Sequence, residues 1–223
     1  RASEEVTVNL KFSGTASQAY DYEKQDSLTI PVGSLSQTLS LKGLDDDIFE
    51  GDESLIVELD SVSKALISTS QNKLNLSLLD DEELPSLSLL CDEEIVSESS
   101  LAAISCTTSL SHKTSKQVSF IIDTSKGSAN LSSDFLLSSS SQIIAPQALT
   151  SSFTVTTVDN EVYEGNKTIK LSLSSLENAS QANEEEVFSI SLTEDESDPN
   201  TRIAFSSYRE NKRQLYLMDA DGS

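Results

Sequence analysis

The sequence contains no Trp, one Met, one His, 4 Pro and 7 Gly among its 223 residues. So little Gly and Pro excludes collagen-like and low-complexity material. The apolar runs are short: none approaches the roughly 20 residues that a membrane-spanning helix needs, and nothing resembles a signal peptide. We therefore expect no membrane insertion. We also expect the chain to be part of a longer protein.

Histidine is too scarce to support the common catalytic sites. The single histidine, His112, lies in the Ser/Lys-rich loop Ser111–Ser115, which we expect to face solvent. It allows at most one Ser-His pairing, and the sequence has no Gly-rich phosphate loop and no Cys metal pair. Paired carboxylates can do acid–base chemistry, but no aromatic cleft is predicted beside them. The sequence therefore predicts a protein that is not an enzyme.

Positive charge is also scarce, since 15 Lys and Arg face 37 Asp and Glu and the formal net charge is −22. A chain so acidic repels phosphates and anionic membrane surfaces, so we expect no nucleic-acid partner. The neutralising partner should be cationic, either metal ions or a basic protein surface. A solvated acidic surface without such a partner is the alternative.

Alternation of apolar and polar residues with a period of two runs through most of the chain and is typical of β-strands. The runs are short and are separated by Gly, Asn, Asp and Ser, which favours an all-β fold of antiparallel sheets with one solvated face. We expect strands around Val6–Phe12, Leu28–Val32, Leu39–Leu41, Leu55–Leu59, Leu74–Leu78, Leu87–Cys91, Ile104–Cys106, Val118–Ile122, Phe153–Val155, Ile169–Leu173 and Phe188–Leu192.

An internal repeat divides the chain. Asp45–Gly51 (DDDIFEG) recurs as Asp159–Gly165 (DNEVYEG), the same shift carries Asp80 to Glu194, and nearly the same shift carries Asp21 to Asp134. Such a shared register predicts two tandem immunoglobulin-like β-sandwiches, residues 1–84 and 85–198, followed by a partial unit, residues 199–223. The first repeat lacks a counterpart of Ser86–Ser99 and begins one strand late. It should therefore be the less stable repeat, or borrow a strand.

Acidic residues fall at the ends of the expected strands. Loops of matching parity gather at one end of an antiparallel sandwich, so acids that are far apart in sequence can converge there. In the first repeat these acids are Asp21, Asp45, Asp46, Glu50, Asp80, Asp81 and Glu82. Crowded carboxylates raise each other's pKa, and a hard cation with roughly six to eight oxygen ligands relieves the repulsion. Ca²⁺ fits better than the stricter Mg²⁺, and a single histidine disfavours zinc and copper.

Four motifs of the first repeat resemble those of a known family. They are Asp21-Tyr22, Ile30–Gly33 (IPVG), Asp45–Glu53 (DDDIFEGDE) and Leu78–Glu82 (LLDDE). Together they resemble the Calx-β domain, over residues 1–84 and less closely over 85–198. The resemblance implies an immunoglobulin-like sandwich of about seven strands with Ca²⁺ bound in the loops at one end. The family includes calcium-sensing domains of sodium/calcium exchangers and modules of bacterial surface proteins.

By position, the resemblance makes the seven acids of the first repeat its Ca²⁺ ligands. In the second repeat it implies Glu98, Asp134, Asp159, Glu164, Glu194, Asp195 and Glu196. The second repeat departs from the pattern: Asn160 replaces an Asp, Glu194 and Glu196 are longer than Asp, and Asn166-Lys167 replaces Asp52-Glu53. Lys167 brings a positive charge near the site, so we expect the second repeat to bind fewer ions, to bind them more weakly, or to bind none.

The last segment differs in character from the two repeats. Arg202–Ser207 and Gln214–Gly222 resemble part of a blade of the TolB-type, WD40-like β-propeller, and an ordinary hairpin is the alternative.

The two cysteines, Cys91 and Cys106, share the inward parity of their strands. A hairpin that turns at Ser97–Ser100 would place them opposite each other. A disulfide in an oxidising compartment and two buried free thiols both fit this pattern.

These patterns together predict a calcium-binding structural or adhesion module of a larger extracytoplasmic protein, which is extracellular, cell-surface or periplasmic. Ca²⁺ would stiffen the glycine-free joint Asp80–Pro85. We expect calcium ions and other cell-surface proteins as partners, and a monomer unless a strand is exchanged. The alternatives are a calcium-independent spacer or protein-interaction module, and an intracellular calcium sensor.

Overall fold

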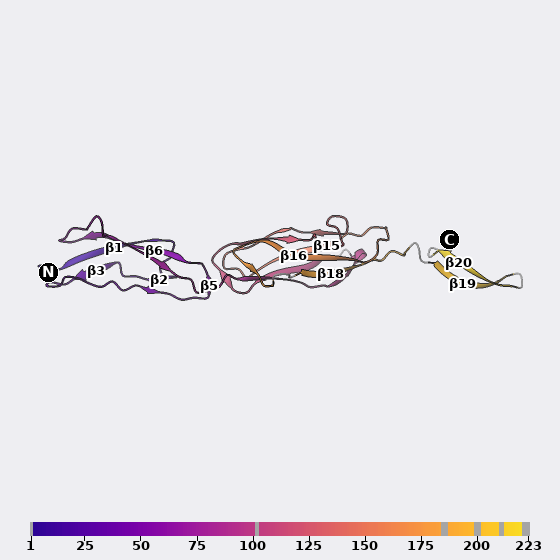
Figure 1. Ribbon diagram of the computed structural model, residues 1–223, viewed down its shortest axis with the longest axis horizontal. Coiled ribbons are helices and arrows are strands. Elements are labelled where there is room, and N and C mark those ends of the chain that lie inside the picture. The colour runs from indigo at the N-terminus through magenta and orange to yellow at the C-terminus, as the bar shows by residue number, and fades with distance from the viewer. Residues whose placement is uncertain (1, 101–102, 184–186, 199–201, 210–211, 220–223) are drawn as a thin grey trace. The chain divides into compact units, whose positions relative to one another are not determined.

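The computed structural model (Figure 1) describes residues 2–100, 103–183, 187–198, 202–209 and 212–219. Within these residues the only helical element is the 3-10 turn η1 (Glu98–Ser100), and the fold is all-β as predicted. No described helix is long and apolar enough to cross a membrane. The chain divides into two compact units: unit 1 contains Arg1–Leu84 and His112–Lys116, and unit 2 contains Pro85–Ser111 and Gln117–Ser223. The domain limits at residues 84 and 198 stay a prediction.

Unit 1 is built on one four-stranded antiparallel sheet with the order β3-β1-β6-β7. Two short pairings complete it, β2 with β4 (antiparallel) and β5 with β11 (parallel). The strands are β1 (Val6–Gly14), β2 (Tyr22–Glu23), β3 (Ser27–Ile30), β4 (Lys42–Gly43), β5 (Ile48–Phe49), β6 (Glu53–Val62), β7 (Lys73–Leu78) and β11 (Lys113–Thr114). The buried core is small and consists of Tyr22, Leu55 and Val57, with half-buried apolar side chains packed around them.

Unit 2 is a sandwich of two five-stranded sheets, with the orders β13-β15-β10-β8-β17 and β14-β12-β16-β18-β9. The strands are β8 (Ser86–Cys91), β9 (Ile95–Ser97), β10 (Ala103–Leu110), β12 (Val118–Asp123), β13 (Phe135–Leu137), β14 (Ser141–Ile144), β15 (Thr150–Thr157), β16 (Lys167–Glu177), β17 (Ser180–Gln181) and β18 (Val187–Thr193). Pairing is antiparallel except at two edges, where β17 runs parallel to β8 and β9 parallel to β18. Apolar residues of both sheets form one continuous core.

Two further strands, β19 (Arg202–Arg209) and β20 (Lys212–Asp219), form an antiparallel hairpin. Phe205 and Tyr216 stack on it with 5.6 Å between ring centroids. The hairpin is what the sequence predicts for this segment, and its resemblance to a propeller blade stays a prediction.

A pair of glycines shows that the two units repeat the same local geometry. A Cβ atom at Gly14, whose φ is +127°, would come within 2.1 Å of the carbonyl oxygen of Ser54. A Cβ atom at Gly127 would come within 2.4 Å of that of Thr168. In both units this carbonyl also accepts hydrogen bonds from the two amides that follow the glycine. The backbone that leads to Asp21 in unit 1, and to its counterpart in unit 2, is therefore fixed in the same way.

The cores of the two units differ in how completely they are covered. Among the described residues, unit 1 has no strand that corresponds to β8 or to β10, so the difference extends beyond the one opening strand expected. The matched positions Leu76 and Ile190 show the result, since they pair with Leu55 and Ile169 respectively. Leu76 is 36% exposed, whereas Ile190 is fully buried.

The two cysteines lie opposite each other in the register of β8 and β10, and a disulfide joins them. Of the two alternatives left by the sequence, the structure therefore shows the disulfide. The two strands pair antiparallel with the cysteines opposite each other, as a hairpin there requires, but the connection between them is more than a turn. The intervening strand β9 pairs with β18 in the opposite sheet instead. The residues of β9, Ile-Val-Ser, do not alternate between apolar and polar, so the sequence does not predict this strand.

The expectation that His112 faces solvent is also wrong. Its side chain is half-buried, and its Nε2 atom lies 2.7 Å from the carbonyl oxygen of Glu83. The loop is ordered by the pairing of β11 with β5, in which Thr114 is buried.

Candidate metal centre

The acids of unit 1 converge in two groups. Carboxylate oxygens of Asp21, Glu50 and Glu53 lie within 4.8 Å of one another, and so do those of Asp45, Asp81 and Glu82. They come from the loop before β2, the turn around β5, the start of β6 and the loop after β7. A cavity of about 60 Å³ has both groups in its wall, together with Asp46 and Asp80. The seven acids named from the sequence in unit 1 therefore lie around one small volume.

Some of these acids build the loops that carry the others. Asp80 Oδ2 accepts a hydrogen bond from the Glu50 amide at 2.7 Å and another from the Gly51 amide. Gly51 has a φ of +72°, a left-handed conformation that suits glycine. Asp46 Oδ1 accepts the amide of Ile48 at 2.8 Å. Burial alone would raise the pKa of Asp80, but hydrogen bonds from the Glu82 side chain and from backbone amides outweigh burial and lower it.

Crowding is most evident at Glu50. Burial, followed by the charges of Asp21, Glu53 and Asp46, raises the pKa of Glu50 to about 7. Burial and Asp21 also raise the pKa of Glu53. Each carboxylate disfavours ionisation of its neighbours, so the cluster either retains a proton or is stabilised by a cation.

The donor set of unit 1 fits a hard divalent cation. It consists of carboxylate oxygens from several loops, which is the ligand type that Ca²⁺ prefers. Among the described residues, no Lys or Arg forms a salt bridge with any of the six acids of the two groups. The nearby Lys116 lies over the ring of Phe49 at 5.3 Å and lowers the pKa of Glu53 only as a minor contribution.

Sequence reasoning missed Glu53 as a member of the site. It belongs to the DDDIFEGDE motif, and it stands three residues after Glu50. Glu53 begins β6, so its side chain returns to the cavity after the turn at Gly51. The available signal was the charge reversal at the matching position of the second repeat, where Lys167 stands.

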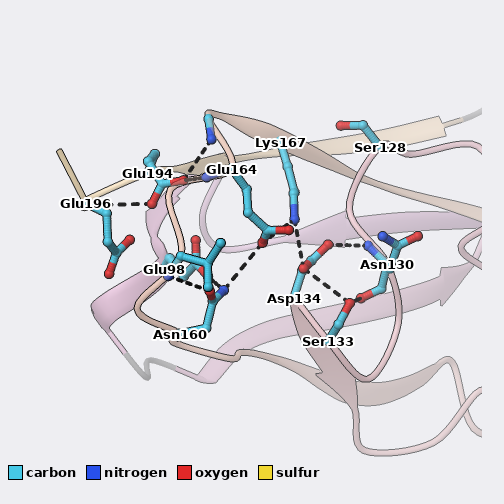
Figure 2. Close-up of polar contacts among 12 residues, drawn as sticks. Glu98, Ser128, Asn130, Ser133, Asp134, Asn160, Glu164, Lys167, Glu194 and Glu196 are labelled. Carbon is cyan, nitrogen blue, oxygen red and sulfur yellow. Dashed lines mark hydrogen bonds and ion pairs between the residues drawn. The ribbon is translucent and has the colours of Figure 1, made fainter. Parts of the chain in front are cut away.

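Unit 2 has the same loop framework with different charges (Figure 2). Glu194 Oε2 accepts the amides of Glu164 at 2.6 Å and Gly165 at 2.8 Å, as Asp80 does in unit 1. Asn160 Oδ1 accepts the amide of Val162 at 2.9 Å, as Asp46 does for Ile48. The repeated sequence motif therefore produces a repeated set of hydrogen bonds.

Two overlapping groups of acids form in unit 2. Oxygens of Glu98, Glu194 and Glu196 lie within 4.8 Å of one another, as do those of Asp159, Asp195 and Glu196. A hydrogen bond with Glu196 is the largest contribution that lowers the pKa of Glu194 to about 2, and the same contact raises the pKa of Glu196 to about 7. Glu196 Oε2 is buried and has no hydrogen-bond partner among the described residues. An orphaned carboxylate oxygen beside other carboxylates also fits a cation.

Asp134 and Glu164 belong to neither group. Instead, the Lys167 ammonium bonds to Asp134 Oδ1 at 2.9 Å and to Glu164 Oε2 at 2.6 Å. Figure 2 shows the Lys167 side chain reaching both carboxylates. Burial of Asp134 would raise its pKa, but hydrogen bonds from the Asn130 amide and from Lys167 outweigh burial and lower it.

The structure thus brings together all seven predicted acids of unit 1 and five of the seven predicted in unit 2. Asp134 and Glu164 lie beside an internal cation, as the proximity of Lys167 in the sequence suggested. Burial and then the charge of Glu194 raise the pKa of Glu98, which is itself buried. That these residues bind metal stays a prediction.

A family model described as Calx-beta domain matches the chain twice, over residues 1–82 and 80–204. Comparison with curated proteins finds no match. Similar solved structures include the apo form of the Calx CBD1 domain, with 13% identity, 50% of this chain and 99% of that chain covered, and a TM-score of 0.37. The calcium binding domain CBD12 of CALX1.1 has 16% identity, coverages of 82% and 71%, and a TM-score of 0.33. Domains 1–6 of the surface layer protein SbsC have 13% identity, coverages of 98% and 37%, and a TM-score of 0.32.

Proposed function

Because the chain belongs to the Calx-beta domain family, we propose that it is a calcium-binding structural module whose acidic loops hold Ca²⁺. The observation that carries this proposal is the convergence of Asp21, Glu50 and Glu53, and of Asp45, Asp81 and Glu82, on one cavity. Members of this family serve as structural or regulatory modules, and we propose that this chain likewise has no catalytic role.

Bound Ca²⁺ would neutralise carboxylates that otherwise repel one another. Some acids of this chain hold the loops in place, and others face the cavity. Asp80 holds the turn at Glu50 and Gly51 through backbone amides, and this leaves the Glu50 carboxylate available to the cavity. Asp81 and Glu82 come from the segment that leads to Pro85, so neutralising them would also order that segment.

The test is thermal unfolding of the full chain in Ca²⁺, in Mg²⁺ and in chelator. Extracellular calcium modules have dissociation constants of about 10⁻⁴–10⁻³ M, and tenfold excess over the constant stabilises by about 1.4 kcal/mol per site. For a domain of this size that corresponds to an increase in Tm of roughly 5–10 °C. Mg²⁺ should give a smaller increase, because it demands a stricter octahedron.

A matched pair of variants makes this test specific. The double variant Asp45→Asn with Asp81→Asn removes two charges from the cavity wall and should lose most of the calcium-induced increase. The control, Asp47→Asn with Asp60→Asn, removes two exposed charges that do not line the cavity and should keep the increase. Equal Tm values in Ca²⁺ and in chelator for the unmodified chain would contradict the proposal.

We further propose that the module works outside the cytoplasm, as part of an extracellular, cell-surface or periplasmic protein with a structural or adhesive role. The disulfide between Cys91 and Cys106 supports this placement, because such bonds persist in oxidising compartments. It weighs against an intracellular calcium sensor. Thiol labelling of the protein taken from its native source, analysed by mass spectrometry, would contradict this placement by finding both cysteines reduced.

A calcium-independent spacer is the second candidate, and Lys167 is the observation that favours it. The Lys167 ammonium already forms ion pairs with two acids of unit 2 and offsets one of their two charges from within the chain. A spacer predicts identical small-angle scattering in Ca²⁺ and in chelator. A calcium-stiffened module predicts a profile that changes on adding Ca²⁺.

A further inference from the structure

We infer that Asn130 of unit 2 is an acceptor for N-linked glycosylation on an exposed loop. The inference goes beyond calcium binding. It rests only on the proposed placement outside the cytoplasm, because chains that receive such glycans are secreted or displayed at the cell surface.

The signal in the sequence is the acceptor motif Asn-x-Ser/Thr, in which x is any residue except Pro. The chain contains this motif four times, at Asn75-Leu76-Ser77, Asn130-Leu131-Ser132, Asn166-Lys167-Thr168 and Asn178-Ala179-Ser180. So short a motif also arises by chance, and an acceptor must in addition lie on a surface loop. The structure therefore has to distinguish among the four asparagines.

Three of the four asparagines are engaged in the fold. Asn166 Oδ1 accepts a hydrogen bond from the amide of Glu194 at 3.0 Å. Asn178 is half-buried, and its Nδ2 atom, which would carry the sugar, donates to the carbonyl oxygen of Gln117 at 2.9 Å. Asn75 lies within β7, where pairing with β6 holds the backbone of its motif extended. None of the three combines a loop position with an unengaged side chain.

Asn130 meets both requirements. It lies in the loop before β13, and residues 130–133 are all exposed. Its backbone amide donates to Asp134 Oδ2 at 2.6 Å (Figure 2), and its backbone carbonyl accepts the Asp134 amide at 3.0 Å. Among the described residues, none forms a hydrogen bond with its carboxamide. The loop is therefore held by backbone atoms of Asn130, and its side chain is left accessible.

The matching loop of unit 1 shows that the carboxamide is not needed to build this loop. Ser17 stands in place of Asn130, and its amide likewise donates to the carboxylate of the Asp four residues further on. The left-handed residue also recurs, as Ala19 with a φ of +70° and Ser132 with a φ of +78°. The asparagine is therefore an addition to the loop and not a part of its scaffold.

The reaction forms one bond and breaks one. Asn130 Nδ2 attacks the anomeric carbon of a sugar carried on a lipid diphosphate, and a transferase of the secretory pathway brings the two together. A C–N bond forms while the bond from that carbon to the phosphate oxygen breaks. The lipid diphosphate leaves with the electron pair, and one Nδ2 proton passes to a base of the transferase. The Ser132 hydroxyl that the motif requires is on an exposed residue.

The test is to secrete the full chain from a cell line that performs N-glycosylation and to map the modified asparagines by mass spectrometry. Enzymatic removal of the glycans converts each modified Asn to Asp. Asn130 should be the most occupied of the four sites, and occupancy no higher than at Asn166 or Asn178 would contradict the inference. An unmodified Asn130 in chains whose disulfide has formed would overturn it, since the disulfide reports passage through an oxidising compartment.

Variants of the motif make the assignment specific. Asn130→Ser, which copies unit 1, and Ser132→Ala should each lose this glycan, whereas Ser132→Thr should keep it. Asn130→Ser should also shift the Tm of the unglycosylated chain by no more than about 2 °C. A larger decrease would show that the carboxamide belongs to the scaffold and would count against the inference.

A transplanted motif tests the loop itself. Ser17→Asn with Ala19→Ser places an Asn-Gln-Ser motif in the matching loop of unit 1, which should then gain a glycan. The control Ser180→Ala removes the motif at Asn178 and should leave the occupancy of Asn130 unchanged. None of these measurements uses Ca²⁺, so a chain that binds no calcium would refute the proposed function and leave this inference standing.

Discussion

Units 1 and 2 carry the same loop framework on cores of different completeness and with opposite charge at one position. In unit 2 two five-stranded sheets enclose a continuous core, whereas unit 1 has one four-stranded sheet and a core cluster of three buried side chains among the described residues, Tyr22, Leu55 and Val57. In unit 2 Lys167 lies between two acids and offsets one of their charges, whereas in unit 1 the matching Glu53 adds a third acid. The hydrogen bonds from backbone amides to a carboxylate oxygen are therefore the same in both units. They depend neither on the size of the core nor on the charge of the residues at the site.

The largest difference between the two units should be in the unfolding free energy lost when Ile190 or its counterpart Leu76 is truncated. Ile190→Ala leaves a cavity in a closed core and should cost about 2–5 kcal/mol of unfolding free energy. Leu76→Ala removes a side chain that is already 36% exposed, so it should cost less than about 1.5 kcal/mol. Denaturant unfolding of the full chain, followed by hydrogen exchange in each unit, measures both values. Equal costs would show that unit 1 is as well packed as unit 2.

Smaller effects on the unfolding free energy should appear at the matched acids Asp134 and Asp21. Here the expected effect in unit 2 differs in sign from that in unit 1. In chelator, Asp134→Asn removes the charge that pairs with Lys167 and should destabilise by about 1–3 kcal/mol. Asp21→Asn removes one of three crowded charges, and the amide oxygen can still accept from Ser17. It should be neutral or stabilising. Thermal melts in chelator provide the comparison, and destabilisation by both variants would remove the distinction between the two units.

The smallest effect is a pH dependence that belongs to the crowded acids. The pKa of Glu50 rises from 4.5 to about 7 on folding, so the folded state binds more protons than the unfolded state between these values. Stability in chelator should therefore be highest near pH 4.5 and fall as pH increases through about 7. Glu50→Gln should flatten this slope. Because Glu196 in unit 2 has a similarly raised pKa, Glu196→Gln is needed to remove its share.

The raised pKa of Glu50 also predicts that Ca²⁺ binding releases a proton. If Ca²⁺ binds at Glu50, the ion must displace the proton held near pH 7. Titrations in buffers of different ionisation enthalpy should then report proton release, and Glu50→Gln should reduce it. Identical heats in all buffers would exclude Glu50 from the ion's ligands.

Much of this architecture follows from the sequence, and the exceptions have physical causes. Alternation places Leu55 and Val57 inward, and the strand ends bring the acids together because loops of one parity share an end of the sheet. The three residues of β9 do not alternate between apolar and polar, so the strand between the cysteines was missed. Nor does alternation show that Glu53, the first residue of a strand, returns to the cavity after a left-handed glycine. The resemblance to the Calx-β family is confirmed, whereas the ligand roles depend on chemistry that a fold does not determine.

The disulfide of unit 2 closes a loop that includes a residue of the candidate metal centre. Its two cysteines are 15 residues apart, and the segment that they close contains Glu98. A closed loop of that length limits the freedom of the unfolded chain by about 3 kcal/mol, and in the folded chain it anchors both ends of the segment that presents this carboxylate. If Glu98 contacts an ion, oxidation and ion uptake strengthen each other, because linkage acts equally in both directions. Reduction would then loosen the ion, and a bound ion would make the sulfur–sulfur bond harder to reduce.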